Sequence, residues 1–337
     1  MSTSAANRAL AVIGGMTARG LQRTSHSLAD LDTGGRWAVS VGFEGDAVLA
    51  QFKHWSQDPP RQSEVGAFQP PTGPWRDSLP QESFESAVRQ VRELIAAGEV
   101  YQVNVCRLLS ADVAADYDPA ALWQRIAGEH PAPYGGFLRL PEVSVVSASP
   151  ELFLSRDGDR VRSGPIKGTA ASRDGFSAKD RAENIMIVDL VRNDMGRVSK
   201  PGSVTVPGLM TIEEHPGLFH LVSYVSADLV PGTSWTQLFE ALFPPGSVTG
   251  APKLAALDVI ADLEPEPRGP YCGAFGWVDA DRGTAELAVA IRTFWIRDSV
   301  IRFGTGAGIT WGSDPEAEWR ETQLKAQRLT ALANGAG

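Results

Sequence analysis

Stretches in which apolar and polar residues alternate follow one another along this chain, often with no helical pattern between them. Residues 135–140, 143–149, 151–157 and 159–163 form one such run, and 272–280, 284–296 and 299–309 form another. Alternation with a period of two is typical of β-strands that have one buried face. Consecutive strands joined by short turns pair antiparallel, whereas repeated βαβ units would need a helix after each strand. The pattern predicts an α+β fold of layered antiparallel β-sheets flanked by helices.

Other segments carry apolar residues at helical spacing and lie between the predicted strands. These predicted helices cover residues 83–98, 119–128, 178–194, 235–243, 253–263 and 315–332. In the first of them, Ser83 is the expected N-cap and Gly98 the expected stop.

The first 80 residues differ in pattern from the rest. Strands are predicted over 37–44 and 47–55, and the proline-rich span 59–80 indicates a linker or surface loop. We expect residues 1–80 to pack on the same core as one main domain formed by 81–337.

Composition excludes several classes of protein. The chain has 337 residues, 43% of them apolar, and a formal net charge of −9, which argues against a nucleic-acid partner. The two cysteines, Cys106 and Cys272, have neither disulfide-framework nor zinc-site spacing, which fits a reducing cytoplasm. The sequence shows no secretory signal pattern and no run of about 18 apolar residues, so neither secretion nor membrane insertion is expected.

One lysine, Lys167, lies in the short segment 163–169, SGPIKGT, directly after a predicted hairpin around Gly158. Glycines on both sides leave room for a ligand, and Pro165 restricts the backbone, so we expect a turn that holds the amine in place. A partly desolvated lysine has a lowered pKa and can act as a nucleophile. The alternative is an ordinary solvated loop lysine.

Two of the predicted helices carry acidic faces. Asp180 and Glu183 are three residues apart on one, and Glu318, Glu321 and Lys325 share a face of the last helix. If the two faces converge, they form an oxygen-rich site of the kind that Mg²⁺ prefers. The alternative is a pair of solvated helix faces with intrahelical salt bridges.

Further polar residues have both a functional and a structural interpretation. Ser247 and Thr249, in PPGSVTGAPK, can donate hydrogen bonds to a ligand or cap an ordinary turn. Arg292 interrupts an apolar strand and needs an anionic partner, which a carboxylate ligand or an internal acid can supply. His220 has the same ambiguity, and the glycines of 304–309, GTGAGI, give only a weak signal for an anion site.

Taken together, these motifs resemble the chorismate-utilising enzymes, the family that includes anthranilate, isochorismate and salicylate synthases and component I of aminodeoxychorismate synthase. From about residue 82 to the end, the family's motifs appear in the family's order, namely SASPELF, PIKGT, KDRAENIMIVDLVRND, HLVS, PPGSVTGAPK, YCGAFGW, AIRT, GTGAGI and PEAEWRETQLKA. The resemblance implies that 81–337 is a chorismate-binding catalytic domain. It also implies a set of roles: Glu183 and Glu321 bind Mg²⁺ with Asp180 and Glu318 close behind, Tyr271, Arg292 and Gly308 hold the substrate's carboxylates, and His220 lines the pocket.

Two positions separate members of this family. Family members that add water to chorismate look to have a lysine base at the position where this chain has Gln102. The resemblance therefore disfavours water activation by this chain. Anthranilate synthases typically read PLAGT or PIAGT where this chain reads PIKGT, as aminodeoxychorismate synthases do. The resemblance therefore implies aminodeoxychorismate synthase component I, which forms 4-amino-4-deoxychorismate for 4-aminobenzoate and folate synthesis. Anthranilate synthase component I and a non-catalytic scaffold that binds an amidotransferase are the alternatives.

The implied chemistry uses Lys167 and Glu151. Lys167 would attack C2 of chorismate while Glu151 protonates the departing C4 hydroxyl, and ammonia would then add at C4 and expel the lysine. Gln102, Ser247, Thr249 and Lys325 are expected to face the substrate as well. The family takes ammonia from a separate glutamine amidotransferase subunit, and no Cys, His, Glu set for glutamine hydrolysis is apparent in this chain.

Overall fold

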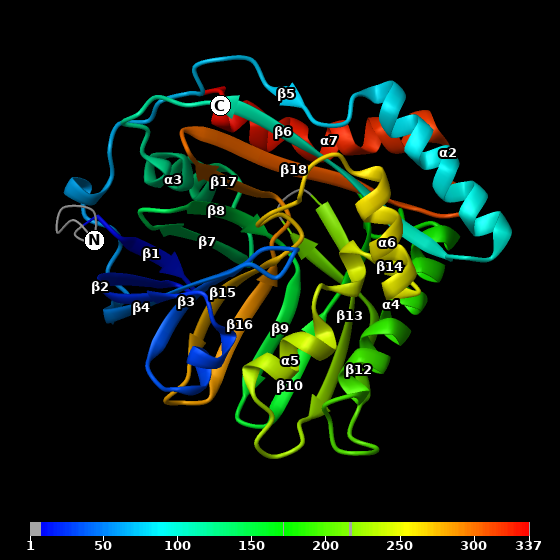
Figure 1. The fold of residues 1–337 in the computed structure, drawn as a ribbon, viewed down its shortest axis with the longest axis horizontal. Helices are drawn as coiled ribbons and strands as arrows, with labels where there is room; N and C mark the ends of the chain where they lie inside the picture. Colours follow the sequence, from blue (N-terminus) through cyan, green and yellow to red (C-terminus); the bar gives the residue numbers. More distant parts are fainter. Residues whose placement is uncertain (1–7, 171, 216–217, 337) are drawn as a thin grey trace.

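A computed structural model describes residues 8–170, 172–215 and 218–336, so the first seven residues of the expected amino-terminal segment lie outside the described residues. Figure 1 shows one broad, curled β-sheet with helices along its outer faces. The strands are β1 Leu10–Ile13, β2 Met16–Ser25, β3 Arg36–Val41, β4 Ala47–Ser56, β5 Arg76–Asp77, β6 Gln102–Asp112, β7 Tyr134–Arg139, β8 Ser144–Ser149, β9 Leu152–Asp157, β10 Arg160–Gly164, β11 Ile166–Ala170, β12 Thr205–His215, β13 Leu218–Asp228, β14 Gly250–Ala251, β15 Ala274–Asp279, β16 Thr284–Val289, β17 Thr293–Arg297 and β18 Val300–Ile309. The α-helices are α2 Gln81–Ala97, α3 Pro119–Glu129, α4 Ala178–Gly196, α5 Trp235–Leu242, α6 Lys253–Leu263 and α7 Pro315–Ala333. Short 3-10 turns, η1 Leu28–Asp32, η2 Gln62–Glu64 and η3 Gly246–Val248, lie in the connections between these elements.

Antiparallel pairing connects the strands in one continuous path. Starting from β6, the neighbours are β18, β17, β8, β7, β1, β2, β4, β3, β15, β16, β9, β10 and β13, with β11 and β12 beside β13. Strands from the first 60 residues therefore lie between strands of the later chain. The expected α+β fold with antiparallel sheets is confirmed.

The sheet folds back so that its two halves pack against each other. Gly136 of β7 faces β15, because a Cβ at this glycine would lie 2.9 Å from the ring of Phe275. Phe275 fills part of the space between the halves, whereas Phe137, on the other face of β7, stacks against Trp123 of α3, and both rings are almost completely buried. Burial of this kind is the main favourable contribution to folding.

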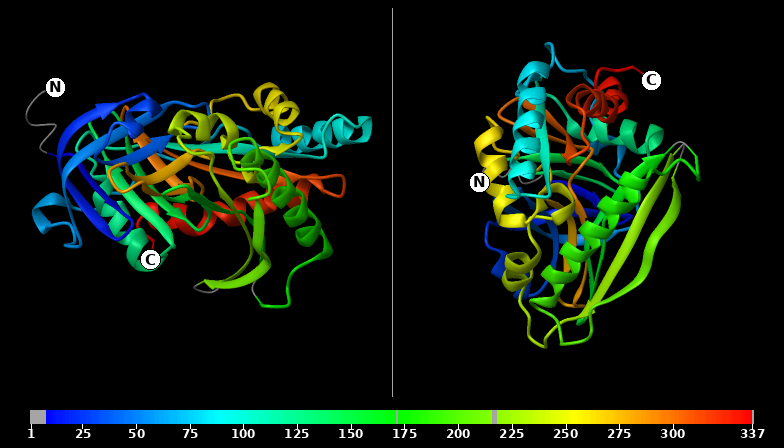
Figure 2. Two further views of the ribbon diagram at one scale, coloured as in Figure 1. Left: turned by 90° about the horizontal axis from the view of Figure 1, so that it is seen from below. Right: turned by 90° about the vertical axis from the view of Figure 1, so that its right-hand side faces the viewer.

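The helices cover the outside of the curled sheet. Helices α2 and α7 lie along β6 and β18, and α4 lies along the long β12–β13 pair (Figures 1 and 2). One anchor of α4 is Asn184, whose buried amide donates to the carbonyl of Leu221 on β13 at 3.1 Å. None of the helices in the described part of the chain is long and apolar enough to span a membrane.

All six predicted helices are present, with ends within three residues of the expected ones. The first ends at Gly98 as expected, because this residue has φ of 81° and closes the helix in the left-handed conformation. Its start was predicted wrongly: the N-cap is Pro80, not Ser83, which lies inside the helix.

Three other expectations about local structure are corrected. Lys167 lies on strand β11, not on a turn, because the backbone after Pro165 pairs with β13 through Ile166 and Val222. The predicted strand 284–296 is two strands, because Arg292 has φ of 51° and turns the chain from β16 in one half of the sheet to β17 in the other. The proline-rich span is a surface loop and not a linker, since Glu64 within it accepts hydrogen bonds from Arg19 at 2.8 and 3.0 Å.

Candidate active site

Strand β11 places the amine of Lys167 in a half-buried position among charged groups. Its Nζ donates to the carbonyl oxygen of Ser247 at 2.9 Å. Burial lowers the pKa of Lys167, and the nearby carboxylates of Glu183 and Glu151 oppose this lowering only in part. A lysine of this kind has more of its amine in the neutral, nucleophilic form than a solvated lysine does.

Glu151 lies just ahead of β9 and is 3% exposed. Its Oε1 has no hydrogen-bond partner among the described residues. Burial raises the pKa of Glu151 to about 7, although the Ser247 hydroxyl, the Lys167 charge and the Ile166 amide all act to lower it. A carboxyl group with this pKa is partly protonated near neutral pH and can donate a proton.

Gln102 of β6 and Gly308 of β18 lie beside Lys167, where these two strands pair. The side chain of Gln102 is fully buried, yet neither its amide nitrogen nor its amide oxygen has a hydrogen-bond partner among the described residues. A Cβ at Gly308 would lie 2.5 Å from Gln102 Nε2 and 3.8 Å from Lys167 Nζ. Only glycine leaves this space open, and an orphaned buried amide at its edge indicates a place for a polar ligand.

Carboxylates from α4 and α7 approach each other beside this point. The ammonium of Lys179 lies between them, 3.0 Å from Glu318 Oε1 and 3.7 Å from Glu183 Oε1. Glu183 Oε1 is buried and accepts no hydrogen bond from the described residues, and burial raises the pKa of this carboxyl, with Glu318 adding to the effect. The two helices therefore hold like charges close together, which is favourable only with a cation between them.

The other two acidic residues have different surroundings. Glu321 forms an ion pair of 2.6 Å with Lys325, and this partner outweighs burial so that the pKa of Glu321 is lowered. Asp180 accepts hydrogen bonds from the amide and hydroxyl of Ser177 at 2.8 and 2.6 Å, so its carboxylate closes the start of α4.

These carboxylates fit a divalent cation that keeps most of its water ligands. Among the described residues, no group of three His, Cys, Asp or Glu side chains is gathered closely enough to hold a metal ion by itself. Magnesium commonly takes only one or two protein carboxylates together with substrate oxygens, and the orphaned oxygen of Glu183 is of the required type. Glu183 and Glu318 are the pair that one cation already bridges.

Arg292 carries a positive charge that the described part of the chain does not pair. Its half-buried guanidinium forms no ion pair with any described residue, and burial alone lowers its pKa. Its charge, after burial, also helps to lower the pKa of His130. An anionic ligand would supply the missing partner.

Tyr271 is held by packing rather than by a charged partner. Its ring covers Gly304, where a Cβ would lie 2.1 Å from the ring, and its hydroxyl accepts a weak hydrogen bond from Cys106 Sγ at 3.9 Å. Burial raises the pKa of Tyr271, so the phenol stays neutral and can donate.

The remaining predicted residues divide between the site and its frame. Thr249 donates to the carbonyl of Pro245 at 3.1 Å, so its hydroxyl closes the turn that carries Ser247. Lys325 donates to the carbonyl of Gly306 at 3.0 Å as well as to Glu321. His220 is 1% exposed on β13, opposite Thr169 of β11.

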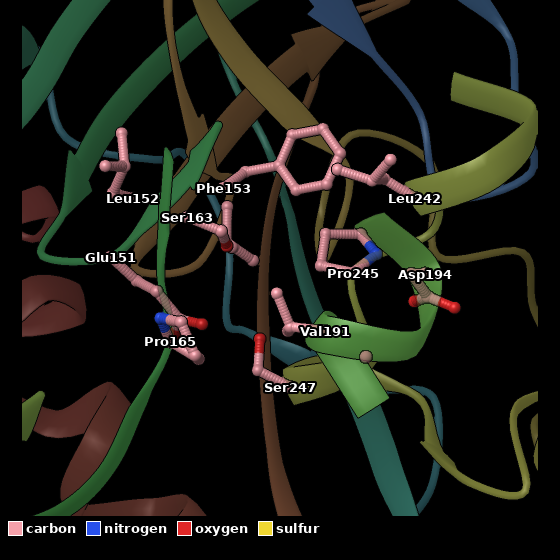
Figure 3. Close-up of a pocket in the computed structure, with 12 residues that line it drawn as sticks. Glu151, Leu152, Phe153, Ser163, Pro165, Val191, Asp194, Leu242, Pro245 and Ser247 are labelled. Carbon is pink, nitrogen blue, oxygen red and sulfur yellow. The ribbon is translucent and has the colours of Figure 1, made fainter. Parts of the chain in front are cut away.

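A small cavity opens beside Glu151 (Figure 3). Glu151, Ser247 and Ser163 line it together with Phe153, Val191 and Leu242, and Asp194 lies at its other end. Asp194 forms a buried ion pair of 2.6 Å with Lys253. The cavity shows that Glu151 borders unfilled space.

Residues 30–331 match the sequence pattern of the chorismate binding enzyme family. The chain belongs to the chorismate-binding enzymes. The match begins well before residue 82, where the resemblance was expected to begin, and it therefore includes most of the amino-terminal strands.

Chorismate-binding enzymes with different products are similar to this chain to the same degree. Aminodeoxychorismate synthase component 1 of Escherichia coli is 38% identical over 77% of this chain and 59% of its own length. Anthranilate synthase component 1 of Streptomyces coelicolor is 39% identical over 77% of this chain and 53% of its own length. The chain thus spans only a little over half the length of these relatives. The crystal structure of anthranilate synthase component I from Streptococcus pneumoniae has a TM-score of 0.78 and 25% identity, and the alignment covers 96% of this chain and 89% of that one.

Sequence reasoning missed two features of the site. Lys179, which lies between Glu183 and Glu318, is four residues before Glu183, and this spacing was the available signal. Arg268 and Glu264 have the same spacing, but nothing in the sequence shows that their contacts reach the site.

Proposed function

We propose that this chain is the chorismate-binding component of an aminodeoxychorismate synthase, which converts chorismate and ammonia to 4-amino-4-deoxychorismate for 4-aminobenzoate and folate synthesis. The observation that carries the proposal is the half-buried Lys167 amine, which lies close enough to Glu151 for each charge to affect the pKa of the other. Direct replacement of a hydroxyl by ammonia at one carbon with retention is difficult, and a protein nucleophile divides it into two displacements.

In the proposed reaction, neutral Lys167 attacks C2 of chorismate and the ring double bonds shift. Glu151 gives its proton to the C4 hydroxyl, which leaves as water. Ammonia then adds at C4, the double bonds shift back, and the C2–nitrogen bond to Lys167 breaks. The ammonium that Lys167 formed by its attack departs as the neutral amine, and the proton that the incoming ammonia gives up reprotonates Glu151. Lys167 and Glu151 thus return to their starting forms after one turnover.

The other described residues would hold chorismate in position for these steps. Arg292 offers an unpaired guanidinium for one carboxylate, and Gln102 offers an amide beside the space above Gly308. Glu183 and Glu318, with Glu321 nearby, would hold Mg²⁺, which when bound neutralises negative charge on the substrate's ring carboxylate.

Anthranilate synthesis is the second candidate because the relatives with that activity are equally similar. If the chain makes 4-amino-4-deoxychorismate, incubation with chorismate, Mg²⁺, ammonium and the lyase that acts on this product should yield 4-aminobenzoate. Anthranilate is strongly fluorescent and needs no lyase. Anthranilate as the main product would overturn the proposal, and chorismate binding without any turnover would favour a non-catalytic scaffold.

We expect ammonium to support turnover by the isolated chain and glutamine to support it only after an amidotransferase subunit is added. Cys106 and Cys272 are 2% and 0% exposed, so neither thiol can reach a glutamine molecule. Replacing both with Ala should leave glutamine use unchanged in the assembled complex. Glutamine hydrolysis by the purified single chain would contradict this expectation.

We also expect kcat/KM for chorismate to fall as the pH rises above about 7, because Glu151, whose pKa is raised to about 7 by burial, must be protonated to act as an acid. Ser247→Ala removes a hydroxyl that lowers this pKa, so the basic limb of the profile should move to higher pH. A pH–rate series on both proteins measures the shift. A basic limb at the same pH in both would show that another group controls it.

A further inference from the structure

A buried arginine lies behind the candidate active site, between α6 and β15. Arg268 is 1% exposed, and its Nε and Nη2 donate to the two oxygens of Glu264 at 2.8 and 2.6 Å. Nη1 donates to the carbonyl of Val248 at 2.8 Å, and Nη2 also donates to the carbonyl of Asn104 at 2.7 Å. One guanidinium therefore joins the end of α6, the turn 246–249 and strand β6.

Glu264 extends the same connection along β6. Its Oε1 accepts a hydrogen bond from the backbone amide of Cys106 at 2.8 Å while it also accepts from Arg268. Asn104 donates its own amide to the carbonyl of Thr249 at 2.7 Å, so the strand and the turn are also bonded directly to each other. The pair thus fixes both the strand and the turn at their point of contact.

The backbone that this pair holds adjoins residues that lie beside the proposed catalytic groups. Val248 follows Ser247, whose carbonyl accepts from Lys167 Nζ at 2.9 Å and whose hydroxyl acts to lower the pKa of Glu151. Asn104 is two residues from Gln102, the orphaned amide beside Lys167. A shift of the turn or the strand would therefore change the position of Lys167 relative to Glu151.

Stability alone is a poor explanation for this arrangement. Burying an ion pair costs about as much desolvation free energy as the attraction returns, so such pairs rarely add to stability. The planar fork of arginine reaches Glu264 and two carbonyls at once, which the single ammonium of lysine cannot do. The amino-terminal segment adds to the fixation, because Glu44 accepts from the amides of Arg268 and Gly269 at 2.7 and 3.0 Å and Phe43 stacks on the guanidinium.

We propose that Arg268 and Glu264 form a positioning clamp that sets the geometry of Lys167 and Glu151 through the backbone of Val248 and Asn104. Neither residue is proposed to touch the substrate. The inference rests on the proposed function only in that Lys167 and Glu151 carry out the chemistry. Its test does not depend on which product forms, because the test measures chorismate consumption.

The test is Arg268→Lys, which keeps the charge and loses the fork. We expect kcat for chorismate consumption to fall about 100-fold, since misplacing reacting groups by about 1 Å costs that much, while KM changes less than about threefold. The basic limb of the pH profile should also move to higher pH as the Ser247 hydroxyl leaves Glu151. Arg36→Lys is the matched control, because Arg36 stacks between Trp55 and Trp277 at 4.5 and 4.6 Å and lies on β3, whose strand partners are β4 and β15. It should keep wild-type kcat.

If Arg268→Lys does not fold, Glu44→Ala decides the question. Glu44 is exposed, and its loss frees the backbone of Arg268 without unpairing a buried charge. A reduced kcat with unchanged KM supports the clamp. Wild-type kcat in the folded variants, or an equal loss in Arg36→Lys, overturns it. Chorismate consumption is measured without regard to product, so failure of the clamp is distinct from failure of the proposed function.

Discussion

Replacing Lys167 with Ala is expected to lower the rate of 4-amino-4-deoxychorismate formation by on the order of 1,000-fold, because ammonia from solution would have to replace a nucleophile already held at the reacting carbon. The variant should still bind chorismate, since Arg292, Gln102 and the acidic residues remain. Single-turnover kinetics with saturating ammonium, together with a titration of chorismate binding, separates the two effects.

The control for this variant is Lys200→Ala. Lys200 lies at the surface, and its side chain forms a long ion pair of 3.8 Å with Asp159. We expect wild-type kinetics in this control. If Lys167→Ala also kept the wild-type rate, ammonia would attack directly and Lys167 would have only an electrostatic role.

Replacing Glu183 with Gln is expected to abolish Mg²⁺-dependent turnover and to weaken metal binding by at least about 10-fold, because the orphaned carboxylate oxygen that faces Glu318 loses its charge. Titration with Mn²⁺, followed by electron paramagnetic resonance, measures binding without reference to activity. Thermal unfolding should change little, since Glu183 forms a single long ion pair, of 3.7 Å, with the residues that the structure describes. Unchanged Mn²⁺ affinity would remove Glu183 from the metal site.

Lys179→Met provides the opposite change at the same place. Its ammonium lies 3.0 Å from Glu318 and 3.7 Å from Glu183, so a metal ion has to displace it. Removing the ammonium should therefore tighten Mn²⁺ binding, whereas Lys200→Met should have no effect. Weaker Mn²⁺ binding in Lys179→Met would show that the lysine supports the site instead of competing for it.

Periodicity predicted the helices well because local signals set their ends. Asp314 caps α7, Ser234 caps α5, and Gly98 ends α2, so the sequence itself shows where these helices begin and end. Strand boundaries depend on partners that are distant in sequence. Periodicity treated residues 284–296 as one strand because the positive φ of Arg292 has no local signature in a non-glycine residue.

Sequence motifs identified the candidate site residues, but only the structure shows what surrounds each of them. Asp180 and Glu183 share a helix face, but the pattern could not show that Asp180 closes the helix start. The contact between Arg268 and Asn104 joins residues 164 positions apart, a pairing that one sequence cannot reveal.

The central claim is that this chain attaches ammonia nitrogen to C4 of chorismate through Lys167. The most direct measurement is the position of the nitrogen in the product formed from ¹⁵N-ammonium and ¹³C-labelled chorismate with Mg²⁺, read from the ¹⁵N–¹³C coupling by nuclear magnetic resonance. Coupling to C4 in the wild-type product, and its loss in Lys167→Ala, is the predicted result. Attachment of nitrogen at C2 leads to anthranilate, so coupling to C2 in the wild-type product would contradict the account.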